Sequence, residues 1–262
     1  MWYTHNLKDR LTNPTLDFEM KLTPTKFKVM GFEEAGNYTA KKIAELGVPL
    51  YLALSGGADS EGALLCLHRN NVSVKPIIVR TEGNKEESAF AFHICRALDI
   101  VPIVIDLSNE DILALFKFYS KKLNSNGIYC IPNFVCSTLA KSNGGVLILG
   151  NHLADESMDG VWNAYMYEWD FYTNTLINPG DIDFFIHTPE IAYAMVAAMD
   201  GSDPHEFKSK LYGTTFRPKI FYKFDSVFDA NVRELTPKKL PSPLADFGHR
   251  DEFLKMMDDW NV

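Results

Sequence analysis

Short apolar runs alternate with amphipathic stretches between residues 47 and 151. The runs are continuously apolar and bounded by turn residues, which is the pattern of strands buried on both faces of a sheet. The stretches between them carry apolar residues at helical spacing. We therefore predict strands over 48–54, 74–79, 100–107 and 145–150, and helices over 59–70, 85–98 and 109–122.

This alternation predicts the fold class. Short buried strands separated by helices are typical of an α/β fold, here a parallel five-stranded sheet with helices on both faces. The helix starts agree with this layout. Asp59 or Ser60 is expected to cap the first helix, and Ser108 with Asp111 resembles a capping arrangement for the third.

The first 46 residues have a different pattern. The segments DFEMKL (17–22) and KFKVMGF (26–32) predict a hairpin around Thr23-Pro24-Thr25, and a helix is expected over about 32–46. We interpret residues 1–46 as a small N-terminal subdomain and residues 47–160 as the main α/β domain.

Beyond residue 160 the strand and helix alternation weakens. Aromatic segments are broken at Pro179-Gly180, while Thr188-Pro189 and Asp203-Pro204 each predict the start of a helix. The sequence thus predicts a mostly helical C-terminal region over 161–262, which we expect to hold the determinants of specificity and of subunit contacts.

Composition narrows the class of protein. Of the 262 residues, 46% are hydrophobic and 23% charged, which indicates a folded chain. The net charge of -8 argues against general binding to nucleic acid or an anionic membrane. No run is apolar enough for a membrane span, and the start lacks a leader pattern. Because the four cysteines are few and irregularly spaced, we expect a cytoplasmic protein without a structural disulfide.

The segment SGGADS, residues 55–60, follows the first predicted strand and opens the first helix. Two glycines at such a junction let backbone N–H groups turn toward an anion, and the helix N-terminus favours negative charge. The spacing matches neither a Walker loop nor the dinucleotide fingerprint. The residues alone leave two interpretations open: a phosphate-binding loop, or a tight turn between strand and helix.

SGGADS resembles the SGGxDS signature of the PP-loop superfamily, the N-type ATP pyrophosphatases. That superfamily includes the asparagine synthetase C-terminal domain, the NAD and GMP synthetases, QueC enzymes and tRNA-lysidine synthetase. The resemblance implies an adenine nucleotide alpha hydrolase-like fold and ATP as cofactor. It also implies that an acceptor oxygen attacks the α-phosphate, that the loop holds the departing pyrophosphate, and that AMP leaves last. Residues implied at the nucleotide are Ser55, Gly56, Gly57, Asp59 and Ser60, with Asp59 also catalytic.

Glu61 departs from the superfamily pattern, which usually has a small or neutral residue after the signature. A carboxylate in the first helical turn stabilises the helix but repels a phosphate if it faces one. We expect Glu61 to face solvent.

The segment LILGNHLADESMDG, residues 147–160, supplies acidic residues after the fourth predicted strand. Oxygen ligands there suit Mg²⁺ bound to substrate phosphates. The segment is similar to the GEGADE motif of asparagine synthetase and the GHHADD motif of tRNA-lysidine synthetase, which implies Asp155 and Glu156 as Mg²⁺ ligands and Gly150 as a nucleotide contact. The alternative is an acid-rich helix N-terminus. His152 lacks partners at zinc-ligand spacing.

Other candidate residues follow from the resemblance. The base of ATP is expected against the main chain of Ile78 and Val79, with Arg80 as a weaker candidate that could instead be a solvated strand end. Within the basic group Arg217, Lys219 and Lys223, Lys219 is the expected catalytic cation that neutralises pyrophosphate, although a solvated basic face is the commoner explanation for such a group.

Two further sets of residues are ambiguous. The aromatic residues between 162 and 172 could wall an acceptor pocket or form core. Cys130 and Cys136 could suggest sulfur transfer, but the close C-x-x-C pair of tRNA-thiolating relatives is missing.

The leading hypothesis is an ATP-dependent synthetase that adenylates a carboxylate or carbonyl of a small-molecule acceptor and transfers an amine or ammonia to it. We expect no N-terminal glutaminase within the 46 residues that precede the first strand of the sheet. The sequence identifies neither the ammonia source nor the oligomeric state. A non-catalytic ATP-binding regulatory module and a nucleobase- or tRNA-modifying enzyme are the alternatives.

Overall fold

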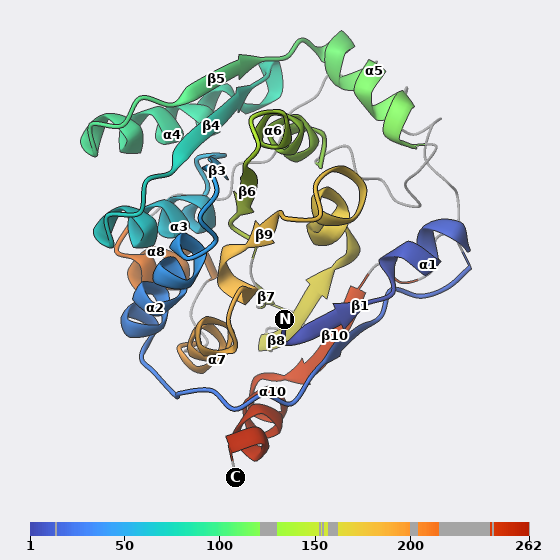
Figure 1. Cartoon of the computed structure of the whole chain (residues 1–262), viewed down its shortest axis with the longest axis vertical. Coiled ribbons are helices and arrows are strands. Elements are labelled where there is room, and N and C mark those ends of the chain that lie inside the picture. Colours follow the sequence, from blue (N-terminus) through green and yellow to red (C-terminus); the bar gives the residue numbers. More distant parts are fainter. Residues whose placement is uncertain are drawn as a thin grey trace.

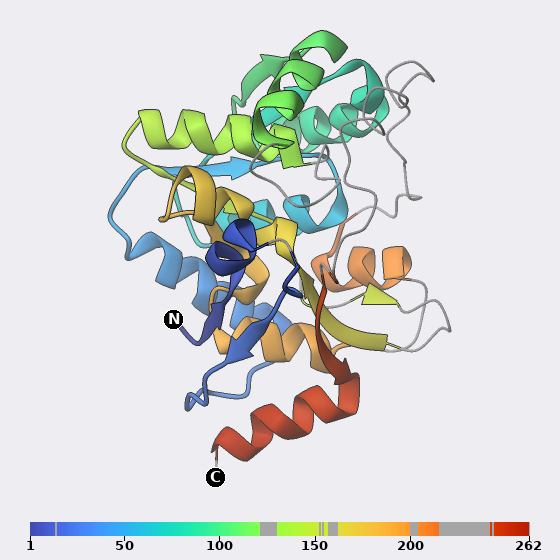
Figure 2. The same ribbon diagram turned by 90° about the vertical axis from the view of Figure 1, so that its right-hand side faces the viewer.

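The structure is a computed structural model, and it describes residues 1–13, 15–120, 130–151, 153, 155–156, 162–199, 204–214, 242 and 244–261. In both views helix α10 (Arg250–Asp258) lies at the end of the molecule opposite helix α5 (Asn109–Ser120) (Figures 1 and 2). No helix in these ranges is both long and apolar enough to cross a bilayer.

A five-stranded parallel sheet organises the middle of the chain, with strand order β5-β4-β3-β6-β9. This confirms the predicted fold class. The strands are β3 (Leu50–Ala53), β4 (Lys75–Arg80), β5 (Ile103–Asp106), β6 (Val146–Leu149) and β9 (Ile182–Asp183). Strands β3, β5 and β6 lie within their predicted ranges, and β4 ends one residue beyond its range, at Arg80. The sequence pattern did not place β9.

Helices cover both faces of this sheet, as predicted. Those of the α/β part are α2 (Phe32–Ala44), α3 (Ala58–Arg69), α4 (Lys85–Ala97), α5 (Asn109–Ser120) and α6 (Ile131–Ser142). Helices α7 (Pro189–Ala197), α8 (Pro204–Tyr212) and α10 (Arg250–Asp258) follow the sheet. Helix α6 lies on the opposite side of the sheet from α2 and α3 (Figure 1). Its pattern was not recognised in the sequence.

Alternating strand residues build a separate core on each face of the sheet. Leu52, Ile78 and Ile148 point into the cluster formed with α2, α3, α4 and α7. Tyr51 and Leu147 point into the cluster formed with α6. Because both faces of the central strands are buried, the middle of each of these strands is apolar, which is why they could be predicted.

The strand order reverses between β3 and β6. The chain runs outward from β3 to β4 and β5, and then returns to the other side of β3 to form β6. At such a switch point the connections after the two central strands diverge and leave a crevice at the carboxyl edge, where ligands bind in open α/β sheets. Both sequence motifs follow strands of this central pair.

Two antiparallel sheets lie outside the main sheet. Strands β1 (Tyr3–His5) and β2 (Met20–Leu22) pair with each other, and β8 (Trp162–Tyr167) pairs with both β7 (Asp155–Glu156) and β10 (Leu244–His249). The predicted hairpin of 17–22 with 26–32 is therefore wrong: residues 20–22 pair with 3–5, across helix α1 (Leu7–Thr12).

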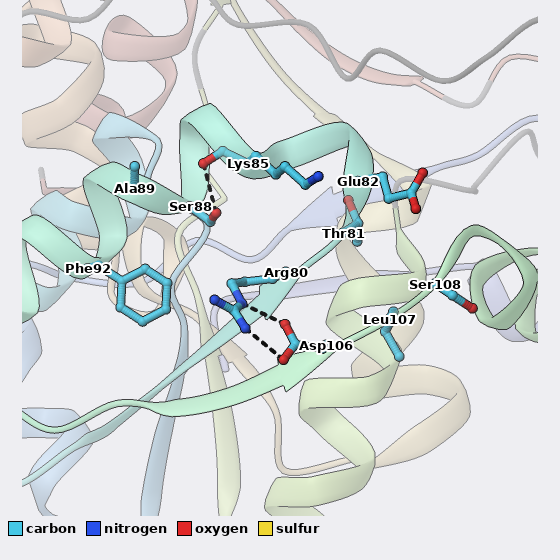
Figure 3. A pocket seen from close by; sticks show the side chains of 10 residues that line it. All are labelled: Arg80, Thr81, Glu82, Lys85, Ser88, Ala89, Phe92, Asp106, Leu107 and Ser108. Atoms are coloured by element: carbon cyan, nitrogen blue, oxygen red, sulfur yellow. Dashed lines mark hydrogen bonds and ion pairs between the residues drawn. The ribbon is translucent and has the colours of Figure 1, made fainter.

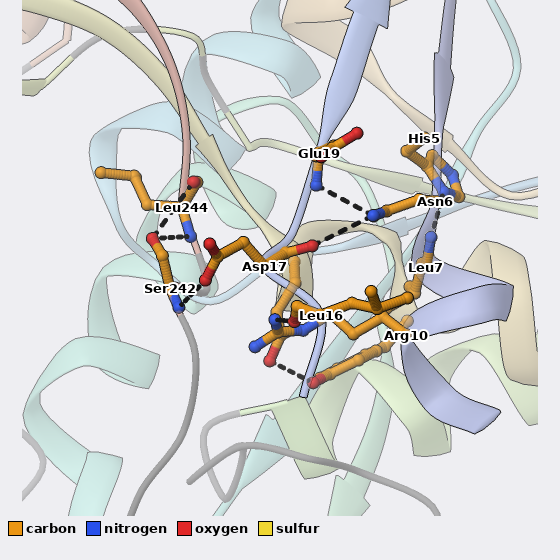
Figure 4. Close-up of polar contacts among 11 residues, drawn as sticks. His5, Asn6, Leu7, Arg10, Leu16, Asp17, Glu19, Ser242 and Leu244 are labelled. Atoms are coloured by element: carbon orange, nitrogen blue, oxygen red, sulfur yellow. Dashed lines mark hydrogen bonds and ion pairs between the residues drawn. The ribbon is translucent and has the colours of Figure 1, made fainter. Parts of the chain in front are cut away.

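Hydrogen bonds join a segment near the start of the chain to a segment near its end. Asp17 accepts a bond from the Ser242 N–H at 2.8 Å, and the Phe18 N–H donates to the Ser242 carbonyl at 2.9 Å. The Asn6 amide ties the start of the chain to the Asp17 carbonyl (Figure 4). One apolar cluster contains residues from the first 20 positions and from α10. The division at residues 46 and 160 stays a prediction.

A buried ion pair fixes α1 to the part of the chain after β8. Arg10 donates to Glu168 and to the Leu16 carbonyl, and both charged side chains are fully buried. Tyr172 adds a third bond by donating to Glu168 at 2.8 Å. Breaking a buried pair leaves one uncompensated charge, so this contact specifies where the N-terminal segment docks.

The predicted helix starts had mixed outcomes. Thr188 caps α7 by accepting from the Ile191 N–H, and Ser108 and Asp111 form the expected reciprocal bonds. The caps predicted at Asp59 or Ser60 are wrong, because α3 begins at Ala58 and Gly57 is its N-cap.

Candidate functional site

The loop between β3 and α3 requires glycine at position 56 for a packing reason. Gly56 has φ +100, a left-handed conformation that disfavours any residue with a Cβ. A Cβ there would also collide with the backbone of α4, at 2.9 Å from the Glu87 carbonyl carbon and 3.2 Å from the Ala91 nitrogen. The loop is thus wedged against α4, which fixes its path at the edge of the sheet.

Gly57 has no such packing reason. Its φ is -72, and a Cβ there would meet only two side-chain ends, Ser55 Oγ at 3.3 Å and Glu87 Oε1 at 3.5 Å. As the N-cap of α3 it carries no side chain that could bond the first helical amides, which have no partner inside a helix. Gly57 therefore places no side chain of its own over the start of α3.

The two serines of the motif shape the same turn. The Gly57 N–H donates to Ser55 Oγ at 3.1 Å, and Ser60 Oγ donates to the Gly57 carbonyl at 3.0 Å. The two hydroxyl oxygens are 3.2 Å apart. Ser55, Gly57 and Ser60 are therefore linked within one turn, and their role at a nucleotide stays a prediction.

The second motif meets the first through Gly150. A Cβ on Gly150 would lie 2.8 Å from the Ser60 nitrogen and 2.9 Å from the carbonyl carbon of Asp59. Glycine at this position lets the chain leaving β6 touch the first turn of α3. Asp155 and Glu156 follow as β7, which pairs with β8, so the alternative of an acid-rich helix start is wrong.

Asp59 is held by two side chains of α8. Tyr212 Oη donates to Asp59 Oδ1 at 2.6 Å, and Lys208 Nζ contacts Oδ2 at 3.2 Å. The Lys208 side chain is 8% exposed and that of Asp59 25% exposed. Neither Lys208 nor Tyr212 was identified from the sequence. Their spacing on α8 gives no signal, because a lysine and a tyrosine one turn apart are equally typical of a solvated helix.

Two further carboxylates border the loop. Glu61 is 4% exposed, so the expectation that it faces solvent is wrong. Glu87 places a carboxylate oxygen 3.5 Å from the position of a Gly57 Cβ. Negative charge beside the loop disfavours a bare phosphate and favours a phosphate that arrives with a cation.

Among the described residues, protein side chains alone offer few ligands for a divalent cation near the loop. Over the ranges described, no three His, Cys, Asp or Glu side chains come together as a metal site. Mg²⁺ usually keeps several waters and takes one or two protein carboxylates together with phosphate oxygens. The carboxylate of Asp59 at the start of α3 is a donor of this kind.

Ile78 and Val79 lie in the interior of the sheet. Both side chains are buried, and the Val79 carbonyl accepts a bond from the Asn84 amide at 2.8 Å. Beyond them the chain emerges at Arg80, which forms an ion pair with Asp106 through bonds of 2.6 and 2.7 Å. Arg80 is thus a paired residue at the strand end.

A pocket of about 560 Å³ opens at the carboxyl ends of β4 and β5. In Figure 3 the Arg80–Asp106 pair crosses its floor with the Phe92 ring beside the guanidinium, 5.8 Å from it. Helix α4 lies between this pocket and the loop, since Phe92 faces the pocket and Ala91 faces Gly56. The lining residues are Arg80, Thr81, Glu82, Lys85, Ser88, Ala89, Phe92, Asp106, Leu107 and Ser108.

Some candidate residues fall outside the described part of the chain, and others belong to the core. Lys219, with Arg217 and Lys223, falls outside the described residues, as does His152. Of the aromatic set, Trp162, Phe171 and Tyr172 belong to the apolar core.

All four cysteines are buried thiols. Burial raises the pKa of Cys66 and of Cys95 to about 11 and that of Cys136 to about 12. Burial also raises the pKa of Cys130. Because the thiolate is the reactive form, these environments do not favour sulfur transfer.

Buried acids lie near the ends of β6 and β9, and sequence reasoning missed them. Asp183 accepts a bond from the Asn151 amide at 2.6 Å. Burial, followed by the charge of Asp170, raises the pKa of Asp183 well above its usual range. Burial raises the pKa of Asp170 to about 7, although the hydrogen bond that Asp170 accepts from the Tyr167 N–H lowers this pKa.

Replacing Asp170 with asparagine should remove a pH-dependent loss of stability. An acid whose pKa is higher in the folded state stabilises the fold fully below its unfolded pKa of about 4, and that contribution is lost as pH rises toward 7. The free energy of unfolding of Asp170→Asn should therefore exceed that of the parent by a margin that grows between pH 4 and 7 to about 1–3 kcal/mol. Urea unfolding across this range measures it.

Asp111→Asn is the contrasting control. Hydrogen bonds from Ser108 lower the pKa of this exposed carboxyl, so its contribution is present above pH 4 and is lost in acid. The variant should lose stability at neutral pH. Parallel pH curves for the parent and Asp170→Asn would contradict the assignment of Asp170 as a buried acid.

No protein-family model and no curated protein sequence matches the chain. Solved structures that share part of its arrangement include an NH3-dependent NAD synthetase from Campylobacter jejuni, with a TM-score of 0.37 and 18% identity over 47% of this chain and 58% of that one. A glutamine-dependent NAD+ synthetase from Acinetobacter baumannii, in complex with ADP, has a TM-score of 0.38 and 15% identity over 51% of this chain and 28% of that one. An NMN synthetase from Francisella tularensis has a TM-score of 0.40 and 11% identity over 79% of this chain and 93% of that one.

The chain spans less than two thirds of the length of the first two of these proteins. NAD synthetases are among the enzymes whose signature SGGADS resembles. At these scores and identities the similarity does not bear on activity.

Proposed function

We propose that the chain is an ATP-dependent synthetase of the PP-loop type. It adenylates a carboxylate or carbonyl of a small acceptor, releases pyrophosphate, and transfers an amine or ammonia to the acceptor as AMP leaves. The observation that carries the proposal is the contact between the two motifs at the switch point, where Gly150 packs against Asp59 and Ser60 in the first turn of α3.

The loop is suited to hold the pyrophosphate. A helix N-terminus presents amide donors and a positive dipole end to an anion, and Gly57 places no capping side chain over that end. Ser55 and Ser60 add hydroxyls, and Lys208 adds a positive charge within reach of Asp59. Fixed donors at the departing group lower the barrier because they need no reorganisation during the reaction.

The adenosine half would extend past the ends of β4 toward Arg80. A cation bound with the nucleotide would neutralise charge on its phosphates, and Asp59 would hold that cation together with Asp155 and Glu156. Lys219 keeps its proposed role as a second cation at the pyrophosphate.

The acceptor's oxygen provides a direct test. In the proposed reaction that oxygen bonds to the α-phosphorus and stays on AMP when the nucleophile attacks the acceptor carbon. Incubation with Mg-ATP, an ammonium salt and pools of ¹⁸O-labelled carboxylates should yield pyrophosphate and AMP that carries one ¹⁸O. Mass spectrometry of the AMP measures it, and the unlabelled pool is the control.

Other outcomes separate the alternatives. Tight ATP binding without turnover in any pool would contradict the proposal and favour a regulatory module. Label transfer only when a tRNA or nucleobase is supplied would favour the modifying enzyme.

A further inference from the structure

Asp59 and α8 meet through a contact that the motif does not predict. The partners are far apart in the chain, and both carboxylate oxygens of Asp59 are engaged, Oδ1 by the Tyr212 hydroxyl and Oδ2 by the Lys208 ammonium. The orientation of the Asp59 carboxylate is therefore set by α8 as well as by the loop.

The Tyr212 ring is held from three sides. It stacks on Phe185, with centroids 5.2 Å apart and planes 18° apart, and lies 5.6 Å from the Phe32 ring. It also covers Gly62, where a Cβ would lie 2.7 Å from the ring. Gly62 is three residues beyond Asp59 and so on the same face of α3. Glycine there gives the ring the room it needs for its hydroxyl to reach Asp59.

The Tyr212 hydroxyl is a neutral donor inside the protein. The residue is 3% exposed, and its Oη donates to Asp59 Oδ1 at 2.6 Å. A bond from a neutral donor remains when the cation beside the carboxylate changes, whereas Lys208 competes with any incoming cation for Oδ2.

We propose that Tyr212 is a positioning residue for Asp59: it fixes Oδ1, so that Oδ2 can exchange Lys208 for a divalent cation brought by the nucleotide while the carboxylate stays in place. This inference rests on the proposed function, because it assumes that a nucleotide with its cation binds at the loop.

Tyr212→Phe is the test, since it removes one hydroxyl and keeps the ring against Phe185 and Gly62. Calorimetric titration with ATP, with and without Mg²⁺, measures binding independently of turnover. The variant loses a hydrogen bond to a charged group, so its affinity for Mg-ATP should fall about tenfold or more. The Mg²⁺ concentration that gives half-maximal ATP binding should rise. Affinity for metal-free ATP should change by less than about twofold.

Tyr172→Phe is the matched control. Tyr172 is likewise a buried phenol that donates to a carboxylate, Glu168 Oε1 at 2.8 Å, but it lies in a different apolar cluster from Tyr212. Loss of the Tyr172 hydroxyl should lower thermal stability and leave the affinities for ATP and for Mg-ATP unchanged.

A double-mutant cycle separates positioning from packing. If Tyr212 acts through Asp59, then adding Tyr212→Phe to Asp59→Asn should change Mg-ATP affinity no further. An unchanged affinity in Tyr212→Phe, or a tenfold loss that persists in the Asp59→Asn background, would overturn the inference and leave the proposed function standing. Unfolding of Tyr212→Phe while Tyr172→Phe stays folded would assign the hydroxyl a structural role, and a parent protein that binds no ATP would overturn both proposals.

Discussion

Gly56→Ala is expected to lower the free energy of unfolding by roughly 2–5 kcal/mol and to abolish ATP binding. Two costs add. The left-handed backbone, φ +100, is strained for any residue with a Cβ, and the new methyl group would press into the backbone of α4 beside Glu87 and Ala91. Relief requires the loop to move away from α4, which displaces the amides proposed to hold pyrophosphate. Denaturant unfolding and ATP calorimetry measure the two effects.

Gly144→Ala provides the matched control. Gly144 also has a positive φ, +69, but a Cβ there meets nothing within 4 Å. It should show the backbone cost alone, about 1–2 kcal/mol, with ATP binding retained. If both alanine variants behaved alike, the close approach of the loop to α4 would not be a determinant of the site.

Asp59→Asn should reduce the rate of pyrophosphate release from ATP by about 10²- to 10³-fold, because it removes a fixed charge from the proposed reacting centre. The change also takes the negative partner from Lys208, a nearly buried cation, so stability should fall by about 1–3 kcal/mol. Single-turnover assays at saturating ATP separate the first effect from weaker binding.

Asp251→Asn is a suitable comparison for this variant. Asp251 pairs with Arg250 on an exposed surface, where a lost ion pair costs at most about 1 kcal/mol. Its rate should equal that of the parent. A rate in Asp59→Asn within a few-fold of the parent would remove Asp59 from the catalytic assignment.

The sheet and its loop could be predicted because their signals are local. β3, β4 and β6 are buried on both faces, so an apolar run marks each strand without knowledge of its neighbours. Gly56 and Gly57 interrupt such a run directly before a helical pattern. The motif therefore correctly predicted that the loop joins the first strand of the sheet to the helix that follows it.

Contacts between residues far apart in the sequence could not be predicted in the same way. β1 has three residues, too few for a periodic pattern, and it pairs with a segment on the far side of α1. Nothing near Tyr212 or Lys208 in the sequence indicates that they meet Asp59, since the contact depends on how α8 docks on α3. Glu61 was expected in solvent because helix position alone does not reveal what α3 packs against.

A crystal structure with Mg²⁺ and an ATP analogue that resists cleavage between its α- and β-phosphates tests the central claim most directly. The account predicts that the β- and γ-phosphate oxygens lie about 3 Å from backbone nitrogens between Gly56 and Ser60. Phosphates bound away from this turn, for example in the pocket beyond α4 with the loop empty, would contradict it.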